Sequence, residues 1–337
     1  MMNMKQWLAG LMTAETKKAI PILSFPCVQL LGVTVGELTA DSELQARGMK
    51  MIADSCDTLA SVSMMDLSVE AEAFGANVRF TEDEVPTVLG ALVTTEEEAD
   101  ALAVPPVSAG RCPKYVDAIR KACAAITDRP VFAGVIGPFS LAGRLMDVSE
   151  IMVNCYDEPD MVHTVMRKAA EFLTAYILEY KKAGAAGVVM AEPLTGLLSP
   201  TLAEEFSEPY VREIVEAVQD DGFIVIYHNC GGNTPLMTDS ILRTGAAAYH
   251  FGNAVSMREM LEKFPADTVV MGNLDPAGQL KNGTPESVRA ETLRILGECC
   301  SFPNFVISSG CDIPPAANWD NIRAFFDAVR EFYTQSR

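Results

Sequence analysis

Residues 223–230 read FIVIYHNC, an apolar run that ends in a histidine and a cysteine. A short run of β-branched and aromatic residues is typical of a buried strand in a parallel sheet. Side chains two positions apart on a strand point to the same face, so His228 and Cys230 can both reach one metal ion. A second apolar run, FVISSG at 305–310, leads directly into Cys311. Both runs are expected to end at the edge of the sheet where α/β enzymes place their chemistry.

One imidazole and two thiolates form a typical zinc ligand set, and three protein ligands leave a fourth position for water or substrate. We therefore predict that His228, Cys230 and Cys311 bind a catalytic zinc ion. The alternative is core packing, because free cysteines are ordinary core residues and the chain has nine of them. Cys27 follows a predicted strand and remains open as a further ligand. Four others lie in helix-like stretches and are interpreted as packing residues: Cys123, Cys155, Cys299 and Cys300.

Composition describes an ordinary globular chain of 337 residues, 49% of them hydrophobic and 21% charged. We find no apolar stretch of membrane-spanning length and no signal-peptide pattern at the start. Cysteines without a short-spaced framework favour a reducing cytoplasm. The net charge of −19 argues against nucleic acid and anionic membranes as partners. It also means that an anionic substrate has to meet a local positive group or the metal itself.

Short apolar runs alternate with amphipathic segments along the chain, which indicates βαβ units and a parallel sheet. Eight such units favour a single (β/α)8 TIM barrel over 1–337; a doubly wound sheet is the alternative, but no Gly-rich phosphate loop follows the first strand. The eight expected strands are Ala19–Phe25, Leu59–Met65, Val131–Ile136, Gly187–Ala191, Phe223–Tyr227, Ala247–Phe251, Thr268–Gly272 and Phe305–Ser309.

A long segment, residues 66–129, separates the second and third expected strands. It is expected to hold a hairpin near 76–80, an acidic helix near 95–103 and a helix near 114–125. An insertion that leaves the carboxyl end of a strand lies on the face of the active site. We therefore expect this segment to be an inserted lid or docking region rather than a separate domain.

Residues just past each strand converge on one mouth of a barrel. Glu192 ends an expected strand and is the best acidic candidate, as a zinc contact, proton relay or substrate contact; a carboxylate bonded to nearby backbone amides is equally plausible. Asp66 is a second catalytic candidate, although its acidic neighbours also suit a solvated helix start. The full predicted ring is Cys27, Asp66, Gly137, Glu192, His228, Cys230, His250, Asn273, Asp275, Cys311 and Asp312.

Four residues of this ring are predicted to contact substrate or a corrinoid, and three of them have a simpler alternative. His250 ends the sixth expected strand, where a lone histidine is more often a bonded core residue than a ligand. Asn273 and Asp275 are candidates to orient ligands or substrate, and capping or turn roles are equally plausible. Gly137 lets a large flat ligand approach the backbone.

Three motifs resemble the uroporphyrinogen decarboxylase superfamily: GPFSLAG at 137–143, GNLDP at 272–276 and GCDIPP at 310–315. The resemblance covers nearly the whole chain, including DLSVEAEA at 66–73. It implies a TIM barrel. The His-x-Cys motif with a distant cysteine is similar to the branch of zinc-dependent methylcobalamin:coenzyme M methyltransferases. Carried over to this chain, the zinc ligands of that branch are His228, Cys230 and Cys311.

The resemblance implies that zinc activates a small acceptor thiol such as coenzyme M, which takes a methyl group from methylcobalamin as co-substrate. The corrinoid is expected to arrive on a separate corrinoid protein, because the chain has no recognisable corrinoid domain. True decarboxylases use an arginine-rich amino-terminal segment, whereas residues 16–25, TKKAIPILSF, contain no arginine. Porphyrinogen decarboxylation is therefore not expected.

A second departure lies after the sixth expected strand, where relatives usually carry an acidic residue and this chain has Gly252. It leaves the fourth zinc contact open, with His250 or Glu192 as substitutes. It also leaves room for a donor-side methyltransferase, which passes methyl from a methylated small molecule to cob(I)alamin. A non-catalytic corrinoid- or metal-binding module is the third alternative.

Overall fold

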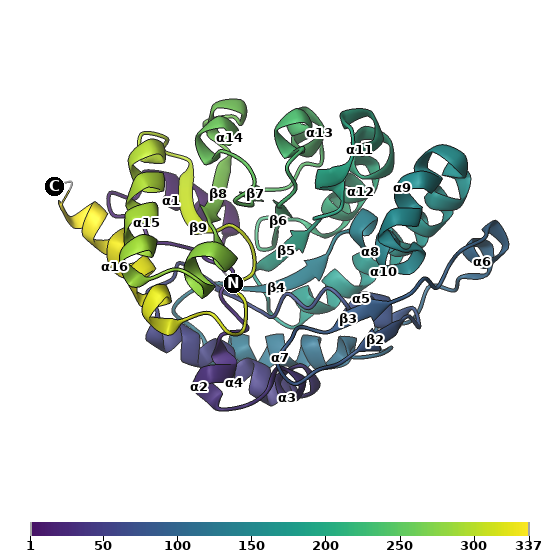
Figure 1. The fold of residues 1–337 in the computed structure, drawn as a ribbon, viewed down its shortest axis with the longest axis horizontal. Coiled ribbons are helices and arrows are strands. Elements are labelled where there is room, and N and C mark those ends of the chain that lie inside the picture. Colours follow the sequence, from purple (N-terminus) through teal and green to yellow (C-terminus); the bar gives the residue numbers. More distant parts are fainter. Residues whose placement is uncertain (1, 336–337) are drawn as a thin grey trace.

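The computed structural model describes residues 2–335, and at its centre a parallel sheet of seven strands curls into a partial barrel (Figure 1). The order across the sheet is β1-β4-β5-β6-β7-β8-β9, so each strand lies beside its predecessor in this series. The strands are β1 (Ser61–Val62), β4 (Val131–Ile136), β5 (Gly187–Ala191), β6 (Ile224–Asn229), β7 (Ala248–Phe251), β8 (Val269–Leu274) and β9 (Phe305–Ser309).

The prediction of a strand at Ala19–Phe25 is wrong, because this segment is extended but forms no regular ladder. Pro21 has no N–H to donate, which interrupts pairing in the middle of the segment. Isolated hydrogen bonds remain on both sides. Ile20 N–H donates to the carbonyl of Ile307 in β9 (3.1 Å), and Leu59 N–H, just before β1, donates to the carbonyl of Ala19 (2.9 Å). The segment thus lies between β9 and β1, and the fold is TIM-barrel-like with seven regular strands.

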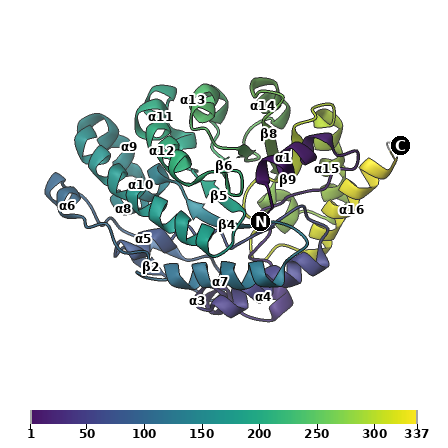
Figure 2. The same cartoon turned by 180° about the vertical axis from the view of Figure 1, so that it is seen from behind.

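Alternation along the strands divides the core into an inner and an outer cluster. The inner cluster fills the barrel and includes Ile224 and Ile226 of β6, Ala248 of β7 and Val306 of β9. Helix α1 (Met4–Thr13) adds Met4, Leu8 and Leu11 to the same cluster and covers one end of the barrel (Figure 2). Continuing this inward alternation, positions 228, 250 and 308 also face the interior.

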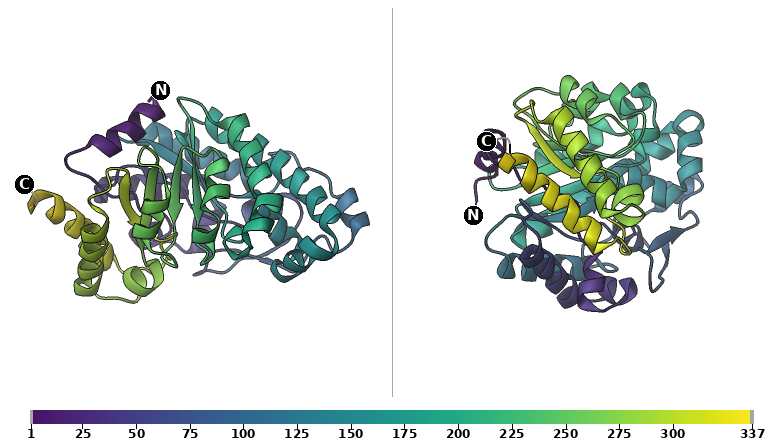
Figure 3. Two further views of the ribbon diagram at one scale, coloured as in Figure 1. Left: turned by 90° about the horizontal axis from the view of Figure 1, so that it is seen from above. Right: turned by 60° about the vertical axis from the view of Figure 1, so that its left-hand side comes forward.

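The other helices pack outside the sheet and bury the outer cluster against the strands (Figure 3). Their bounds are α2 (Cys27–Leu31), α3 (Val35–Ala40), α4 (Ser42–Ser55), α5 (Val69–Ala73), α6 (Glu96–Ala101), α7 (Cys112–Ala125), α8 (Pro138–Met146), α9 (Val148–Asp157), α10 (Pro159–Lys182), α11 (Pro200–Phe206), α12 (Glu208–Val218), α13 (Thr238–Arg243), α14 (Met257–Lys263), α15 (Pro285–Cys299) and α16 (Trp319–Gln335). Short turns of helix are η1 (Thr195–Leu197), η2 (Thr234–Leu236) and η3 (Pro276–Lys281). Within residues 2–335, no helix has the length and apolar character needed to cross a membrane.

The segment 66–129 begins with α5 and continues into an antiparallel hairpin, β2 (Asn77–Arg79) and β3 (Thr87–Leu89). Helix α6 follows and packs against α10 at the periphery of the molecule (Figure 1). Helix α7 packs against α4 and β4, in the place of the helix that connects two neighbouring barrel strands. The part of this segment outside the regular βα pattern is therefore residues 66–111.

Candidate metal centre

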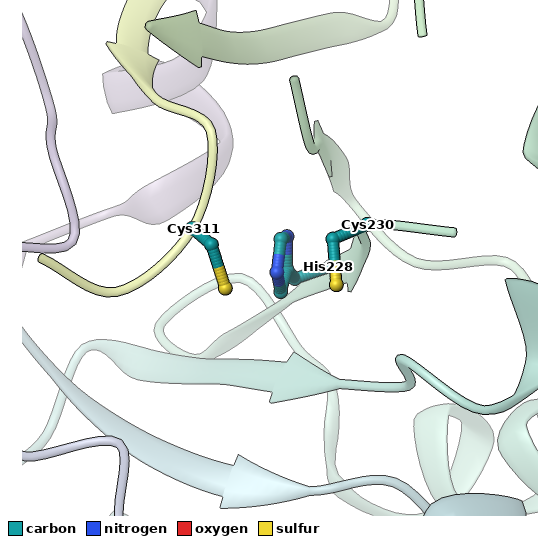
Figure 4. Close-up of side chains that lie close together, drawn as sticks. All are labelled: His228, Cys230 and Cys311. Atoms are coloured by element: carbon teal, nitrogen blue, oxygen red, sulfur yellow. The ribbon is translucent and has the colours of Figure 1, made fainter. Parts of the chain in front are cut away.

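The structure brings His228, Cys230 and Cys311 together at the carboxyl ends of β6 and β9 (Figure 4). One ligand atom from each residue, the imidazole nitrogen or the sulfur, lies within 4.8 Å of the other two. His228 is the penultimate residue of β6, Cys230 follows that strand, and Cys311 comes two residues after β9. In Figure 4 the Cys311 and Cys230 side chains lie on either side of the His228 ring, and their sulfur atoms point in the same direction. The arrangement fits one tetrahedral zinc ion with a free fourth position.

The ring of His228 is held so that one nitrogen has no protein partner. Its Nδ1 lies 2.8 Å from Nδ1 of His250 and 3.2 Å from the His250 carbonyl oxygen. Its Nε2 is buried and has no hydrogen-bond partner among the described residues. A buried polar nitrogen without a partner is costly. A metal ion at the cluster would satisfy it, so the donor set fits zinc.

A chain of hydrogen bonds behind His228 accounts for this orientation. Strands β6 and β7 pair His228 with His250, so both rings face the interior of the barrel side by side. His250 Nε2 lies 2.7 Å from Ser308 Oγ, and the Ser308 hydroxyl donates to the carbonyl of Ile20 (2.8 Å). Because that hydroxyl donates to a carbonyl, it accepts from His250 Nε2–H, and His250 Nδ1 in turn accepts from His228 Nδ1–H. This leaves a lone pair on Nε2 of His228 for a metal.

We predict that replacing His250 by phenylalanine lowers zinc affinity by about 10- to 100-fold, because the partner that fixes the His228 ring is lost. Competition with a chromophoric chelator measures the affinity. His163 lies on α10, with its Nδ1 2.8 Å from the Tyr210 hydroxyl, and offers a matched control. His163→Phe should leave zinc affinity unchanged. Equal zinc affinity in His250→Phe and the unmodified protein would contradict this role of His250.

The two thiols of the cluster differ in acidity. Interaction with the Cys311 thiol lowers the pKa of Cys230, against burial, which raises it. The same interaction raises the pKa of Cys311 to about 12, and burial adds to the increase. The interaction therefore favours the thiolate form of Cys230 and the protonated form of Cys311. Cys230 is the readier of the two to bind a cation as thiolate.

Gly252 lies against Cys230. A Cβ atom at position 252 would stand 2.5 Å from the Cβ of Cys230 and 3.1 Å from the carbonyl oxygen of Gly310. Any side chain at this position thus requires the backbone around Cys230 to shift. Asn273 holds the same loop, because its Nδ2 donates to the carbonyls of Gly252 (2.9 Å) and Val255 (2.8 Å). The loop after β7 therefore contributes close packing to the cluster rather than an acidic ligand.

Glu192 caps helix α8 from the neighbouring strand end. The helix begins at Pro138 after Gly137, which has no side chain to cap it, so the first N–H groups need another partner. The Glu192 carboxylate accepts hydrogen bonds from the N–H groups of Phe139 (2.8 Å) and Ser140 (3.0 Å) and from the Ser140 hydroxyl (2.6 Å). A Cβ at Gly137 would stand 2.2 Å from Glu192 Cγ, so this glycine gives the carboxylate room.

Burial raises the pKa of Glu192 from 4.5 to about 7, against the hydrogen bonds from Ser140 and Phe139, which lower it. The folded protein therefore binds this proton more tightly than the unfolded chain does. Its contribution to stability is complete below pH 4.5 and is lost as the pH rises through about 7. Relative to Glu192→Gln, the metal-free protein should lose roughly 2–3 kcal/mol of unfolding free energy between pH 4.5 and pH 8. Urea unfolding at both pH values measures this difference. An unfolding free energy that changes equally with pH in Glu192→Gln and the unmodified protein would contradict it.

Asp66 belongs to a buried network around Arg111. One Asp66 oxygen accepts from Arg111 and from the Tyr115 hydroxyl (2.7 Å), and the other accepts from the N–H and hydroxyl of Ser68. Arg111 also donates from Nε to Glu72 (2.6 Å). Both carboxylate oxygens of Asp66 are thus engaged in positioning the chain that follows β1.

Asp275 caps the turn η3, because its Oδ1 accepts from the N–H groups of Ala277 (2.9 Å) and Gly278 (2.8 Å). Cys27 lies in α2 and faces α4, where a Cβ at Gly48 would stand 2.4 Å from the Cys27 sulfur. Cys27 is not part of the His/Cys cluster formed by the described residues. The contacts of Asp275 are those of a turn cap, and the contacts of Cys27 are those of a core packing residue.

Two residues of these hydrogen-bond networks, Arg111 and Ser308, were not identified from the sequence. Arg111 is separated by 45 positions from Asp66 and lies in irregular chain, so no spacing rule joins them. Ser308 was treated only as part of an apolar strand. Its inward alternation with Val306 was the available clue, because the same alternation places His250 in the interior.

The model of the family described as uroporphyrinogen decarboxylase (URO-D) matches residues 22–332 of the chain. Uroporphyrinogen decarboxylase of Methylobacillus flagellatus is 30% identical over 284 residues, covering 80% of this chain and 78% of that protein. The methylcobamide:CoM methyltransferase MtbA of Methanosarcina mazei is 26% identical over 309 residues, covering 88% of each. A solved methyltransferase from Methanosarcina mazei has the same fold, with a TM-score of 0.86 at 22% identity over 97% of this chain and 98% of that one. With a family model spanning nearly its whole length, the chain belongs to the uroporphyrinogen decarboxylase family.

Proposed function

We propose that this protein is a zinc-dependent methyltransferase that moves a methyl group from a methylated corrinoid to the sulfur of a small thiol such as coenzyme M. The observation that carries the proposal is the buried Nε2 of His228, which has no hydrogen-bond partner among the described residues, in a cluster whose imidazole and sulfur ligand atoms lie within 4.8 Å of one another. A nitrogen and two sulfurs with a free fourth position suit a metal ion that binds a substrate thiol.

One of the relatives supports a methyltransferase. The relative MtbA, named a methylcobamide:CoM methyltransferase, aligns over 88% of this chain. Other relatives of similar identity are named uroporphyrinogen decarboxylase. Against decarboxylation, residues 16–25 contain no arginine to bind the carboxylates of a porphyrinogen. The methyltransferase assignment therefore rests on the metal-ligand set, together with this missing cationic segment.

In this proposal His228, Cys230 and Cys311 hold the zinc ion. Bound there, zinc would lower the pKa of a substrate thiol enough for it to react as thiolate at neutral pH. His250 and Ser308 keep the His228 ring in position through their hydrogen bonds. The overall reaction breaks the cobalt–methyl bond and forms a thioether, leaving both bonding electrons on the corrinoid as cob(I)alamin.

The corrinoid carrier would dock over the loops that follow the strands. Leu197 in η1 and Leu236 in η2 expose 56% and 67% of their surface in the loops after β5 and β6. On the hairpin, Phe80 and Leu89 are exposed by 49% and 47%. Contiguous exposed apolar surface marks protein-binding sites, and we propose that these four side chains contribute to one that contacts the carrier. We include residues 66–111 in this docking region, as a lid over the mouth.

An optical assay tests the proposal. Zinc-loaded protein is mixed without oxygen with methylcobalamin and coenzyme M, and the spectrum of cob(I)alamin is followed. We expect its formation to require both zinc and thiol. Metal-free protein and a reaction without thiol are the controls.

Three outcomes would change the assignment. Methylation of cob(I)alamin by a methylated small molecule, with no transfer to any thiol, would establish the donor-side reaction. Loss of carboxylates from uroporphyrinogen at a rate independent of zinc would overturn the methyltransferase proposal. A zinc-loaded protein without either activity would support a binding module instead.

A further inference from the structure

Arg144 is a half-buried cation without a partner. It lies in the last turn of α8, the helix that follows β4. In the part of the chain that the structure describes, no ion pair and no hydrogen bond involves its guanidinium, and burial lowers its pKa. Arg111, by contrast, is joined to Asp66 and Glu72. Removing an arginine from water without a partner is costly, so an unpaired one points to a ligand.

The guanidinium lines a cavity of about 280 Å³. One wall comes from the chain after β1, with Leu67 and Ser68, and another from the hairpin, with residues 85–88. Liquid water occupies about 30 Å³ per molecule, so the cavity has the volume of roughly nine waters. It suits a small organic molecule and is far too small for a tetrapyrrole.

One residue that lines the cavity is the sequence neighbour of a cysteine of the metal cluster. Asp312 lines it and directly follows Cys311. Its carboxylate accepts a hydrogen bond from the Ser24 hydroxyl (3.3 Å). The cavity is thus lined both by a carboxyl group next to the cluster in sequence and by Arg144. A negative group is favoured at Arg144, and a hydrogen-bond donor such as a thiol is favoured toward Asp312 and the cluster.

We propose that Arg144 and this cavity form a binding site for the anionic end, a sulfonate or carboxylate, of a small substrate whose other end reaches the His228–Cys230–Cys311 cluster. A guanidinium binds planar or tetrahedral oxyanions with two parallel hydrogen bonds. A local cation is needed because the net charge of −19 disfavours anions near the protein surface. The identity of the reacting end as a thiol rests on the proposed function, whereas the anion site does not.

A binding experiment isolates the anion site from the chemistry. Metal-free protein is titrated calorimetrically with ethanesulfonate, with propionate and with neutral propionamide, none of which contains sulfur able to react. We expect one or both anions to bind and propionamide not to bind. Arg144→Gln should weaken anion binding at least about tenfold, and Arg144→Lys less. Arg47→Gln, which removes one exposed charge elsewhere, should leave binding unchanged.

Anion affinity that is equal in Arg144→Gln and the unmodified protein would overturn the proposal, and so would equal binding of propionamide. With zinc-loaded protein, Arg144→Gln should raise the KM for 2-mercaptoethanesulfonate at least about tenfold and leave the KM for neutral 2-mercaptoethanol unchanged. Arg144-dependent anion binding without methyl transfer to either thiol would keep the anion site and reject the proposed function. Methyl transfer to both thiols with no effect of Arg144→Gln would reject the anion site and keep the proposed function.

Discussion

Replacing Cys230 by serine is expected to remove zinc from the protein and to abolish thiol-dependent methyl transfer. Of the two sulfurs, Cys230 has the lowered pKa and is the readier thiolate donor. A serine hydroxyl keeps its proton at neutral pH and is a harder ligand than zinc prefers. The loss of affinity should exceed the about 10- to 100-fold effect of removing a partner outside the ligand set. Zinc per protein after dialysis against a chelator, followed by the optical assay, measures both effects.

Cys300 gives a matched control, because it is exposed, lies outside the His/Cys cluster and has its sulfur 3.9 Å from the carbonyl oxygen of Gly297. Cys300→Ser should retain full zinc content and activity. Loading with cadmium adds a direct readout, since the charge-transfer band of thiolate–cadmium bonds should decrease only in Cys230→Ser. If Cys230→Ser kept both its zinc and its activity, the metal centre and the proposed function would be rejected together.

Most strands of the sheet could be predicted from the sequence, because buried parallel strands are uniformly apolar. β4, β5 and β9 have the predicted bounds, and β6 begins one residue later than expected and extends into His228 and Asn229. The prediction failed at residues 19–25, where composition suits a strand but Pro21 removes a donor. Apolar composition reports burial, whereas ladder formation also needs a backbone donor at every second position.

The ligand cluster was predictable for a similar reason. Strand alternation and the common edge of a parallel sheet bring His228, Cys230 and Cys311 together, and both follow from local sequence. Bonding of Glu192 to backbone amides was one of the two interpretations, but the particular partners of Glu192 and Asp66 were not predictable, because they lie 53 and 45 positions away. A carboxylate at a strand end has the same sequence signature whether it faces a substrate, a helix terminus or an arginine.

Replacing Arg111 by leucine is expected to lower the free energy of unfolding by about 3–5 kcal/mol, because Asp66 would be left as a buried charge without a cation. The side chain of Asp66 is fully buried and that of Arg111 is 7% exposed, so water cannot replace the lost partner. Arg111 also donates to the Ser68 hydroxyl (2.8 Å) and lies 4.8 Å from the ring centre of Phe80 on the hairpin. The hairpin should therefore become more sensitive to proteolysis. Urea unfolding and limited proteolysis measure the two effects.

Arg144 provides the control for this variant, since it is an arginine that lines the same cavity as Ser68 and has no ion pair or hydrogen bond with residues 2–335. Arg144→Gln should change the unfolding free energy by no more than about 1 kcal/mol. Adding Asp66→Asn to Arg111→Leu should restore part of the lost stability, because the buried charge is then gone and the remaining hydrogen bonds suit an amide. A loss below about 1 kcal/mol in Arg111→Leu would contradict the structural role of the network and leave Asp66 free for the chemistry at the mouth. Comparing the two variants thus distinguishes an arginine that stabilises the fold from an arginine that is proposed to bind a ligand.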